Sequence, residues 1–105
     1  MAVIAGRWKA EITWHLCGTT RRFNELRRLL PGITPKMLTQ QLRALERDGI
    51  ISRVQHNEIP PRVEYRTTEL GDTLGPVFST LGNWGLNHSD QVDQARAAYD
   101  GQREP

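Results

Sequence analysis

The sequence predicts an α+β fold that is mainly helical, and two changes of pattern along the chain lead to this prediction. Apolar residues recur at helical spacing up to Gly49, alternate at a spacing near two after it, and return to helical spacing from Glu69. A chain of 105 residues can bury one modest core and no second one. We therefore expect one domain, in which several helices accompany a small β-hairpin.

Two helices are predicted on either side of a polar connector. The first covers residues 7–17, RWKAEITWHLC, and Gly18 ends it. Residues 19–22 form the connector, and a shorter helix over residues 23–30 stops at a Pro-Gly pair. The apolar stripes that define these helices are Trp8, Ile12 and Leu16 in the first, and Phe23, Leu26, Leu29 and Leu30 in the second.

The third predicted helix has the clearest end signals. Thr34 stands where an N-cap residue belongs, Pro35 takes the favoured first helical position, and Gly49 closes the helix. Its buried stripe is expected to be Leu38, Leu42 and Leu45. The opposite side, about 16 Å long by helical rise, carries a polar and basic series made of Lys36, Thr39, Gln40, Arg43 and Arg47.

A β-hairpin is predicted between the third helix and Thr68. Val63, Tyr65 and Thr67 alternate with polar residues and share one face of its second strand. The Pro60-Pro61 pair has no backbone N–H for a strand ladder, so it belongs in the connection, which we place at residues 57–62.

A long helix is predicted from Glu69 onward. Its apolar stripe is interrupted by glycines, so packing must stabilise it, and we expect Pro76 to kink it. Ser89 can cap one last segment, and the end beyond Asp100 is expected to fray. The stripe consists of Leu70, Leu74, Val77, Phe78, Leu81 and Trp84.

Charge is distributed unevenly along the chain. The net charge is only +2, but residues 1–68 have a balance of +6 and residues 69–105 a balance of −4. A basic front and an acidic tail suggest that the first two thirds of the chain face a polyanion. The alternative is that the arginines are ordinary solvated surface residues.

The order of the predicted elements is typical of a winged helix-turn-helix. Two helices joined by a tight turn are followed at once by a hairpin, and a long helix ends the chain. In that arrangement the third helix enters the major groove of DNA. Arg and Lys can donate to guanine edges and Gln can pair with adenine, so the predicted base-contacting residues are Lys36, Thr39, Gln40 and Arg43. The alternative is a solvated helix that happens to be basic.

Further arginines are better placed to contact phosphates than bases, because they lie before the second helix, at the end of the third, and in or beside the hairpin. They would set affinity and not sequence preference. The predicted phosphate-contacting residues are Arg21, Arg22, Arg47, Arg53, Arg62 and Arg66, and Arg27 and Arg28 on the second helix fit the same role. Any of these arginines can instead pair with an acidic neighbour, the candidates being Glu25, Glu46, Glu58 and Glu64.

Three stretches of the chain resemble a known family. GRWKAEITWHL, RRFNELRRLLPGITPKMLTQQLRALERDGIISR and PPRVEYRTTELGDTL are similar to the HxlR-type winged helix-turn-helix transcription regulators, over about Gly6 to Trp84. The resemblance implies operator binding as a homodimer, with the recognition helix at Pro35 to Asp48 and a two-stranded wing at Ser52 to Thr68. It also implies that the first helix and the C-terminal helix after the wing form the dimer.

A dimer also agrees with the number of large apolar residues, which exceeds the needs of so small a core. The predicted dimerisation residues are Ile4, Trp8, Phe78, Leu81 and Trp84. The alternative is that all of them pack within one subunit. We place the winged helix-turn-helix DNA-binding domain with its dimerisation helices at residues 1–88, and a short C-terminal helix or frayed tail at residues 89–105.

The single cysteine leaves open whether this protein senses a signal. Several members of the family that the chain resembles sense electrophiles or oxidants through a cysteine before the first helix, and this chain has none there. Cys17 lies at the end of the first predicted helix and is a candidate thiol sensor if its surroundings lower its pKa. The alternative is an inert small apolar side chain. An unknown small-molecule or redox effector is therefore an open partner.

Other functional classes lack support in the sequence. The three histidines have no carboxylate or cysteine at ligand spacing, so we expect no metal, no other cofactor and no enzymatic activity. No apolar run is long enough to cross a bilayer, and the expected location is the cytoplasm. We predict a transcription regulator, a repressor acting by occlusion, that binds double-stranded DNA with sequence preference. The alternatives are a module that binds a protein partner and a sequence-neutral nucleic-acid binder.

Overall fold

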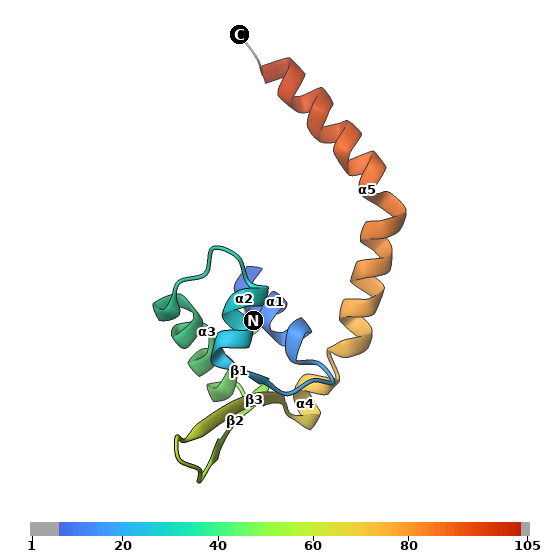
Figure 1. The fold of residues 1–105 in the computed structure, drawn as a ribbon. Helices are drawn as coiled ribbons and strands as arrows, with labels where there is room; N and C mark the ends of the chain where they lie inside the picture. Colours follow the sequence, from blue (N-terminus) through green and yellow to red (C-terminus); the bar gives the residue numbers. More distant parts are fainter. Residues whose placement is uncertain (1–6, 104–105) are drawn as a thin grey trace. The chain divides into compact units, whose positions relative to one another are not determined.

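A computed structural model describes residues 7–103 of the chain (Figure 1). The chain divides into two units that meet between Gly75 and Pro76, and each is described by itself. In order, the elements are α1 (Arg7–Leu16), β1 (Arg21–Arg22), α2 (Phe23–Leu29), α3 (Pro35–Arg47), β2 (Ile51–His56), β3 (Arg62–Thr67), α4 (Glu69–Asp72) and α5 (Gly75–Arg103).

The core of the first unit is formed where α1, α2 and α3 meet the sheet. Its fully buried members include Ile12, Leu16, Leu26, Leu30, Leu38, Leu42, Leu45 and Ile51. Trp8, Phe23 and Tyr65 are partly buried against them. The predicted stripes of the first three helices are confirmed except at Leu29, which is 37% exposed while Leu26 and Leu30 are buried. Of the stripe predicted from Glu69, Leu74 packs against this core but Leu70 is 56% exposed.

The sheet has three antiparallel strands in the order β1-β3-β2. The predicted hairpin is confirmed, and its two strands, β2 and β3, pair from Ile51 with Thr67 to His56 with Arg62. Arg62, which was predicted to lie in the connection, is the first residue of β3. The predicted connector before α2 was wrong for Arg21 and Arg22, which pair with Tyr65 and Glu64 as a third strand. Two residues are too few to show a period-two pattern, and the edge of β3 supplies their partners.

The C-terminal part of the first unit differs from the predicted long helix. Glu69 begins the four-residue helix α4, which Thr68 caps by accepting a hydrogen bond from the Gly71 N–H at 3.1 Å. A break follows at Thr73 and Leu74, before α5. The single helix predicted from Glu69 is therefore two helices. Gly71 and Gly75 lie on either side of the break, and glycine has a low helix propensity.

Helix α5 is the long element of the second unit. Pro76 lies in its first turn, where the missing N–H leaves no helical hydrogen bond unmade, so it starts the helix and the predicted kink was wrong. The helix continues without interruption to Arg103. Ser89 therefore lies inside a helix and does not begin one, and the residues just beyond Asp100 are helical.

Candidate nucleic-acid interface

Helix α3 is bounded by the residues that the sequence predicts. The Thr34 hydroxyl accepts a hydrogen bond from the Met37 N–H at 3.1 Å, and Pro35 occupies the first helical position. At the other end Gly49 has a φ of +76°, and the Ile50 N–H donates to the Leu45 carbonyl at 3.0 Å. This hydrogen bond, from an N–H to the carbonyl five residues earlier, is typical of a helix that ends at a glycine in the left-handed conformation. Both ends of α3 are therefore held in place.

The two sides of α3 have opposite properties. Leu38, Leu42 and Leu45 are almost completely buried and attach the helix to the core. Because residues follow one another by about 100° around a helix, the polar series lies on the opposite side. Its members Lys36, Gln40, Arg43 and Arg47 are exposed, and Thr39 is half-buried.

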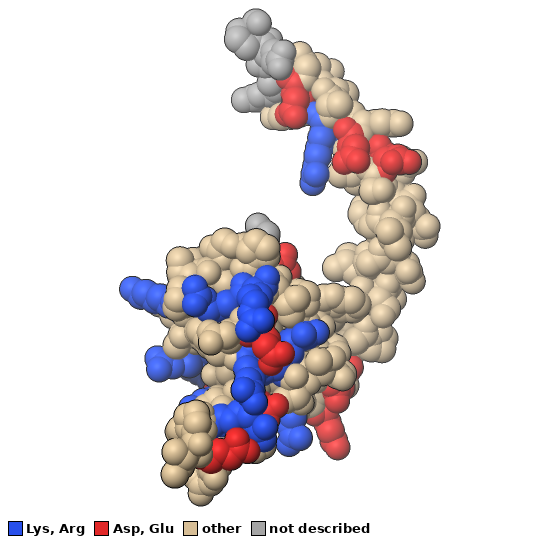
Figure 2. Space-filling model, in the orientation of Figure 1, with Lys and Arg blue, Asp and Glu red and all other residues tan. Residues whose placement is uncertain are grey.

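Two members of this series lie at the edge of α3 that faces the wing, the β2–β3 hairpin with its loop. Thr39 and Arg43 line a shallow cavity of about 410 Å³ together with Arg53 of β2 and Tyr65 of β3. The structure therefore brings Arg43 and Arg53 to one depression. Lysines and arginines are spread over the face of this unit seen in Figure 2.

The six predicted phosphate-contacting arginines fall into two groups. Four of them, Arg22, Arg47, Arg53 and Arg66, have exposed side chains. In the other two, Arg21 and Arg62, the guanidinium group pairs with an oxygen atom of the protein itself. Arg21 donates from Nε to the His15 carbonyl at 2.7 Å, which ties β1 to the end of α1.

Arg62 belongs to an ionic network at the loop end of the wing. Its Nη2 lies 3.3 Å from a carboxylate oxygen of Glu58, and its Nε lies 3.2 Å from one of Glu64. The same oxygen of Glu64 lies 2.6 Å from Nε2 of His56 on β2. The alternative that some arginines pair with acidic neighbours therefore holds for Arg62.

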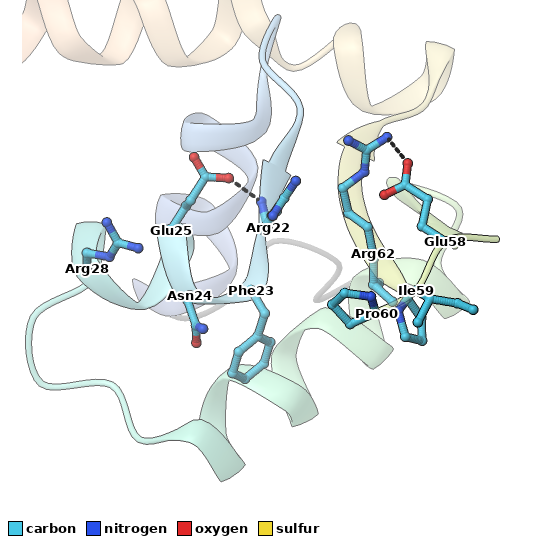
Figure 3. A pocket seen from close by; sticks show the side chains of 11 residues that line it. Arg22, Phe23, Asn24, Glu25, Arg28, Glu58, Ile59, Pro60 and Arg62 are labelled. Atoms are coloured by element: carbon cyan, nitrogen blue, oxygen red, sulfur yellow. Dashed lines mark hydrogen bonds and ion pairs between the residues drawn. The ribbon is translucent and has the colours of Figure 1, made fainter. Parts of the chain in front are cut away.

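Sequence reasoning missed a notch between the start of α2 and the wing loop, residues 57–61. Its volume is about 540 Å³, and Asn24, Arg28 and Ile59 are among its lining residues (Figure 3). Ile59 is fully exposed. An isoleucine between Glu58 and two prolines is the one signal in the sequence that could have drawn attention to this loop.

Helix α5 carries an apolar stripe on one of its faces. At 100° per residue, Val77, Leu81, Trp84, His88, Val92, Ala95 and Tyr99 fall within one arc. Leu81 is 63% exposed and Trp84 is 54% exposed, and the Trp84 ring stacks on that of His88 with centroids 4.8 Å apart. Leu86, 81% exposed, lies on the opposite side of the helix.

The remaining predicted dimerisation residues have different surroundings. Trp8 is partly buried against the core of its own subunit, and Phe78 is half-buried. Ile4 lies outside the described residues. Trp8 therefore serves the fold of its own subunit, and among the described members of the set Leu81 and Trp84 have the largest exposed fractions.

The surroundings of Cys17 disfavour the charged form of its thiol. Partial burial, followed by the negative charge of Asp72, raises the pKa of the Cys17 thiol. A raised pKa leaves less thiolate at neutral pH, and the thiolate is the reactive form. Nearby, burial and then the charge of Arg21 lower the pKa of His15, although Glu11 opposes them. The surroundings of Cys17 favour the alternative of a small, inert side chain.

Within residues 7–103, no group of three or more His, Cys, Asp or Glu side chains is placed to hold a metal ion. In the same part of the chain, no helix combines the length and the apolar character needed to cross a membrane. His15, His56 and His88 lie in α1, β2 and α5.

Comparisons with known proteins return relatives that are described as helix-turn-helix proteins. A family model described as HxlR-like helix-turn-helix matches residues 3–93. The chain is 48% identical over 96 residues to YdeP of Bacillus subtilis (strain 168), described as an uncharacterized HTH-type transcriptional regulator, covering 91% of this chain and 75% of YdeP. Against YtcD of the same organism, which has the same description, the identity is 49% over 88% of this chain and 73% of YtcD. The structure of the redox regulator HypR in its reduced form superposes with a TM-score of 0.83 at 44% identity, covering 88% of this chain and 91% of that chain.

Proposed function

Because the chain belongs to the HxlR-like helix-turn-helix family, whose curated members are transcription regulators and not enzymes, we propose that it represses transcription by binding a palindromic operator as a homodimer. The observation that supports this most directly is the exposed basic side of α3. Leucines anchor the helix from behind, so this side is presented to a partner as a fixed surface.

The chemistry of that surface suits base recognition. Arg43 and Lys36 can donate to the O6 and N7 acceptors of guanine, and Gln40 can pair with both hydrogen-bonding groups of adenine in the major groove. Thr39 can contact a base edge or a thymine methyl group. Arg22, Arg47, Arg53 and Arg66 are exposed, and those that face the duplex would hold the phosphates that fix its register.

A homodimer explains the exposed stripe on α5. Trp84 and Leu81 are large apolar side chains on one face of a long helix, and a symmetric partner would bury the same face of its own copy. Two recognition helices related by a two-fold axis would reach successive major grooves about 34 Å apart. This geometry favours a palindromic site, which a repressor in the cytoplasm would occupy to exclude other proteins.

Selection of duplexes from a random-sequence pool tests the proposal. We expect an inverted repeat to emerge at fixed salt concentration, and Arg43→Ala or Gln40→Ala to lose about 1 to 3 kcal/mol of discrimination at one position of each half-site. Arg27→Ala is the matched control, because Arg27 is an exposed arginine of α2 and not of α3, so its loss should not change discrimination between bases. Equal affinity for every duplex would favour sequence-neutral binding, and no duplex binding would favour a module for a protein partner.

A further inference from the structure

The apolar stripe of α5 has a histidine at its centre. His88 lies eleven residues after Val77 and eleven residues before Tyr99, which are the two ends of the stripe. At 100° per residue the stripe covers an arc of about 80°, and His88 is also at the middle of that arc. A polar, titratable ring therefore occupies the position at which two such stripes would meet.

The ring of His88 is held by the preceding turn of the helix. Its Nδ1 lies 2.9 Å from the main-chain carbonyl oxygen of Trp84, and the two rings stack with their planes 17° apart. A carbonyl oxygen only accepts hydrogen bonds, so Nδ1 carries a proton and donates it. The other ring nitrogen, Nε2, is then an acceptor when the ring is neutral and a second donor when the ring is charged.

Helix α5 offers no opposite charge to a protonated His88 within residues 75–103. The residues one turn away on either side are uncharged, and they are Trp84, Gly85, Gln91 and Val92. The nearest carboxylates, those of Asp90 and Asp93, lie about 160° and 140° around the helix from His88. The nearest charged residue on the side of His88 is Arg96, which is positive and about 12 Å further along the axis. A charge on His88 thus depends on water for its stabilisation.

A symmetric pair of α5 helices brings each His88 to its own copy. If the two helices run parallel about a two-fold axis, every residue of the stripe faces the same residue of the other helix. If they run antiparallel and overlap along the whole stripe, the residue at the middle of the stripe faces its copy. His88 is that residue, so both arrangements place two His88 rings side by side at the axis.

Resting on the homodimer of the proposed function, we propose that two His88 rings meet at the two-fold axis of the α5 interface and that the dimer forms only while both rings are uncharged. A water molecule can bridge the two neutral Nε2 acceptors. Two charged rings repel each other, and an apolar interface removes the water that stabilises their charge.

Acid would then weaken the repressor through its dimer. The uncharged rings bind fewer protons in the dimer than in the free subunits, so the dimer is stable at the higher pH and is lost as the pH falls. A single subunit holds only one half-site of a palindromic operator. We therefore expect operator affinity to fall together with dimerisation.

The pH dependence of the association constant is the first test. Sedimentation equilibrium of the full chain at constant ionic strength covers about pH 8 to about pH 5.5, the range in which histidine changes its charge. The dissociation constant of the dimer should rise about a hundredfold, because a histidine in water is half protonated near pH 6.5 and each subunit must lose one proton on association.

Two variants assign this dependence to a residue. His88→Gln keeps a polar side chain that does not titrate, and it should dimerise equally at both pH values. His56→Gln is the matched control, because it removes a histidine of β2 in the first unit and should keep the full pH dependence. A pH dependence that persists in His88→Gln would overturn the inference.

Disulfide cross-linking tests the position of His88 at the axis. In a chain that carries Cys17→Ser, the substitution His88→Cys leaves one thiol on the stripe, and mild oxidation should link two chains, since a disulfide needs Cα atoms within about 7 Å. Leu86→Cys, on the opposite side of α5, is the control and should not link. Linking of Leu86→Cys as fast as His88→Cys, or no linking of His88→Cys, would overturn the proposed contact.

These outcomes separate this inference from the proposed function. If the wild type is a dimer whose association does not change with pH, the inference fails and the proposed function stands. If the wild type is monomeric at every pH, the proposed homodimer fails and the inference with it. Circular dichroism of each variant at both pH values verifies that α5 remains helical.

Discussion

Gly71 of α4 lies directly against the main-chain carbonyl of Ile50, at the start of the wing. A Cβ on residue 71 would overlap that oxygen and would also stand 3.1 Å from Cβ of Thr67. The same carbonyl accepts a hydrogen bond from the Thr68 N–H at 3.0 Å. This close approach joins α4 to the passage from α3 into β2, so the position of the wing depends on the absence of a side chain at residue 71.

Gly71→Ala should therefore lower the free energy of unfolding. A methyl group placed against a backbone oxygen forces the main chain to move, and overpacking of this kind costs about 1 to 3 kcal/mol or more. Urea denaturation at one protein concentration measures the change. Gly82→Ala is the control, because Gly82 lies inside α5 with no atom within 4 Å of the added Cβ. It should stabilise α5 by about 0.5 to 1 kcal/mol, and an equal loss from both variants would contradict the argument.

The salt dependence of DNA binding should distinguish free arginines from engaged ones. If about six arginines neutralise phosphates, log affinity should fall with log salt at a slope near −5. Arg66→Ala should make this slope shallower by about one, because its side chain is exposed. Arg62→Ala should change it less, since Glu58 and Glu64 already neutralise Arg62. Fluorescence anisotropy between 50 and 200 mM salt, roughly the range over which such contacts are screened, gives both slopes, and a larger change for Arg62→Ala would refute the distinction.

The exposed stripe of α5 should determine the oligomeric state. Leu81→Asp places a charge in the centre of the proposed interface and should weaken dimerisation by about 2 kcal/mol or more. Leu86→Asp makes the same chemical change on the opposite side of the helix, so it should leave the dimer intact. Sedimentation equilibrium measures both association constants. A dimer that tolerates Leu81→Asp but not Leu86→Asp would place the interface on the other face.

Cys17 should react slowly with alkylating agents. Burial and Asp72 raise the pKa of its thiol, so the thiolate fraction at pH 8 is smaller than that of an unhindered thiol. We expect iodoacetamide to modify Cys17 more slowly than N-acetylcysteine at the same pH. The rate should increase with pH and continue to increase above the pKa of N-acetylcysteine. Faster modification than the free thiol would revive Cys17 as a thiol sensor.

Elements whose cause is local could be predicted from the sequence. The limits of α3 depend on Thr34, Pro35 and Gly49, whose effects act within a few residues, and its buried side follows from leucines at helical spacing. The wing loop could be placed because Pro60 has no N–H for a ladder. The DNA-contacting roles of the exposed residues stay predictions until a complex is measured.

The sequence by itself determined the order of the first three helices and the hairpin, the anchored side of α3 and the contrast between the basic first two thirds of the chain and its acidic last third, because periodicity, capping and charge are properties of neighbouring residues. Only the tertiary structure decided that Arg21 and Arg22 form a third strand and that Arg62 is engaged by Glu58 and Glu64. It also decided that Ile59 is fully exposed at the notch between α2 and the wing loop. The strand pairing and the notch depend on which segments meet in space, and the pairing of Arg62 depends on how the wing loop folds back, so none of the three shows in the spacing along the chain.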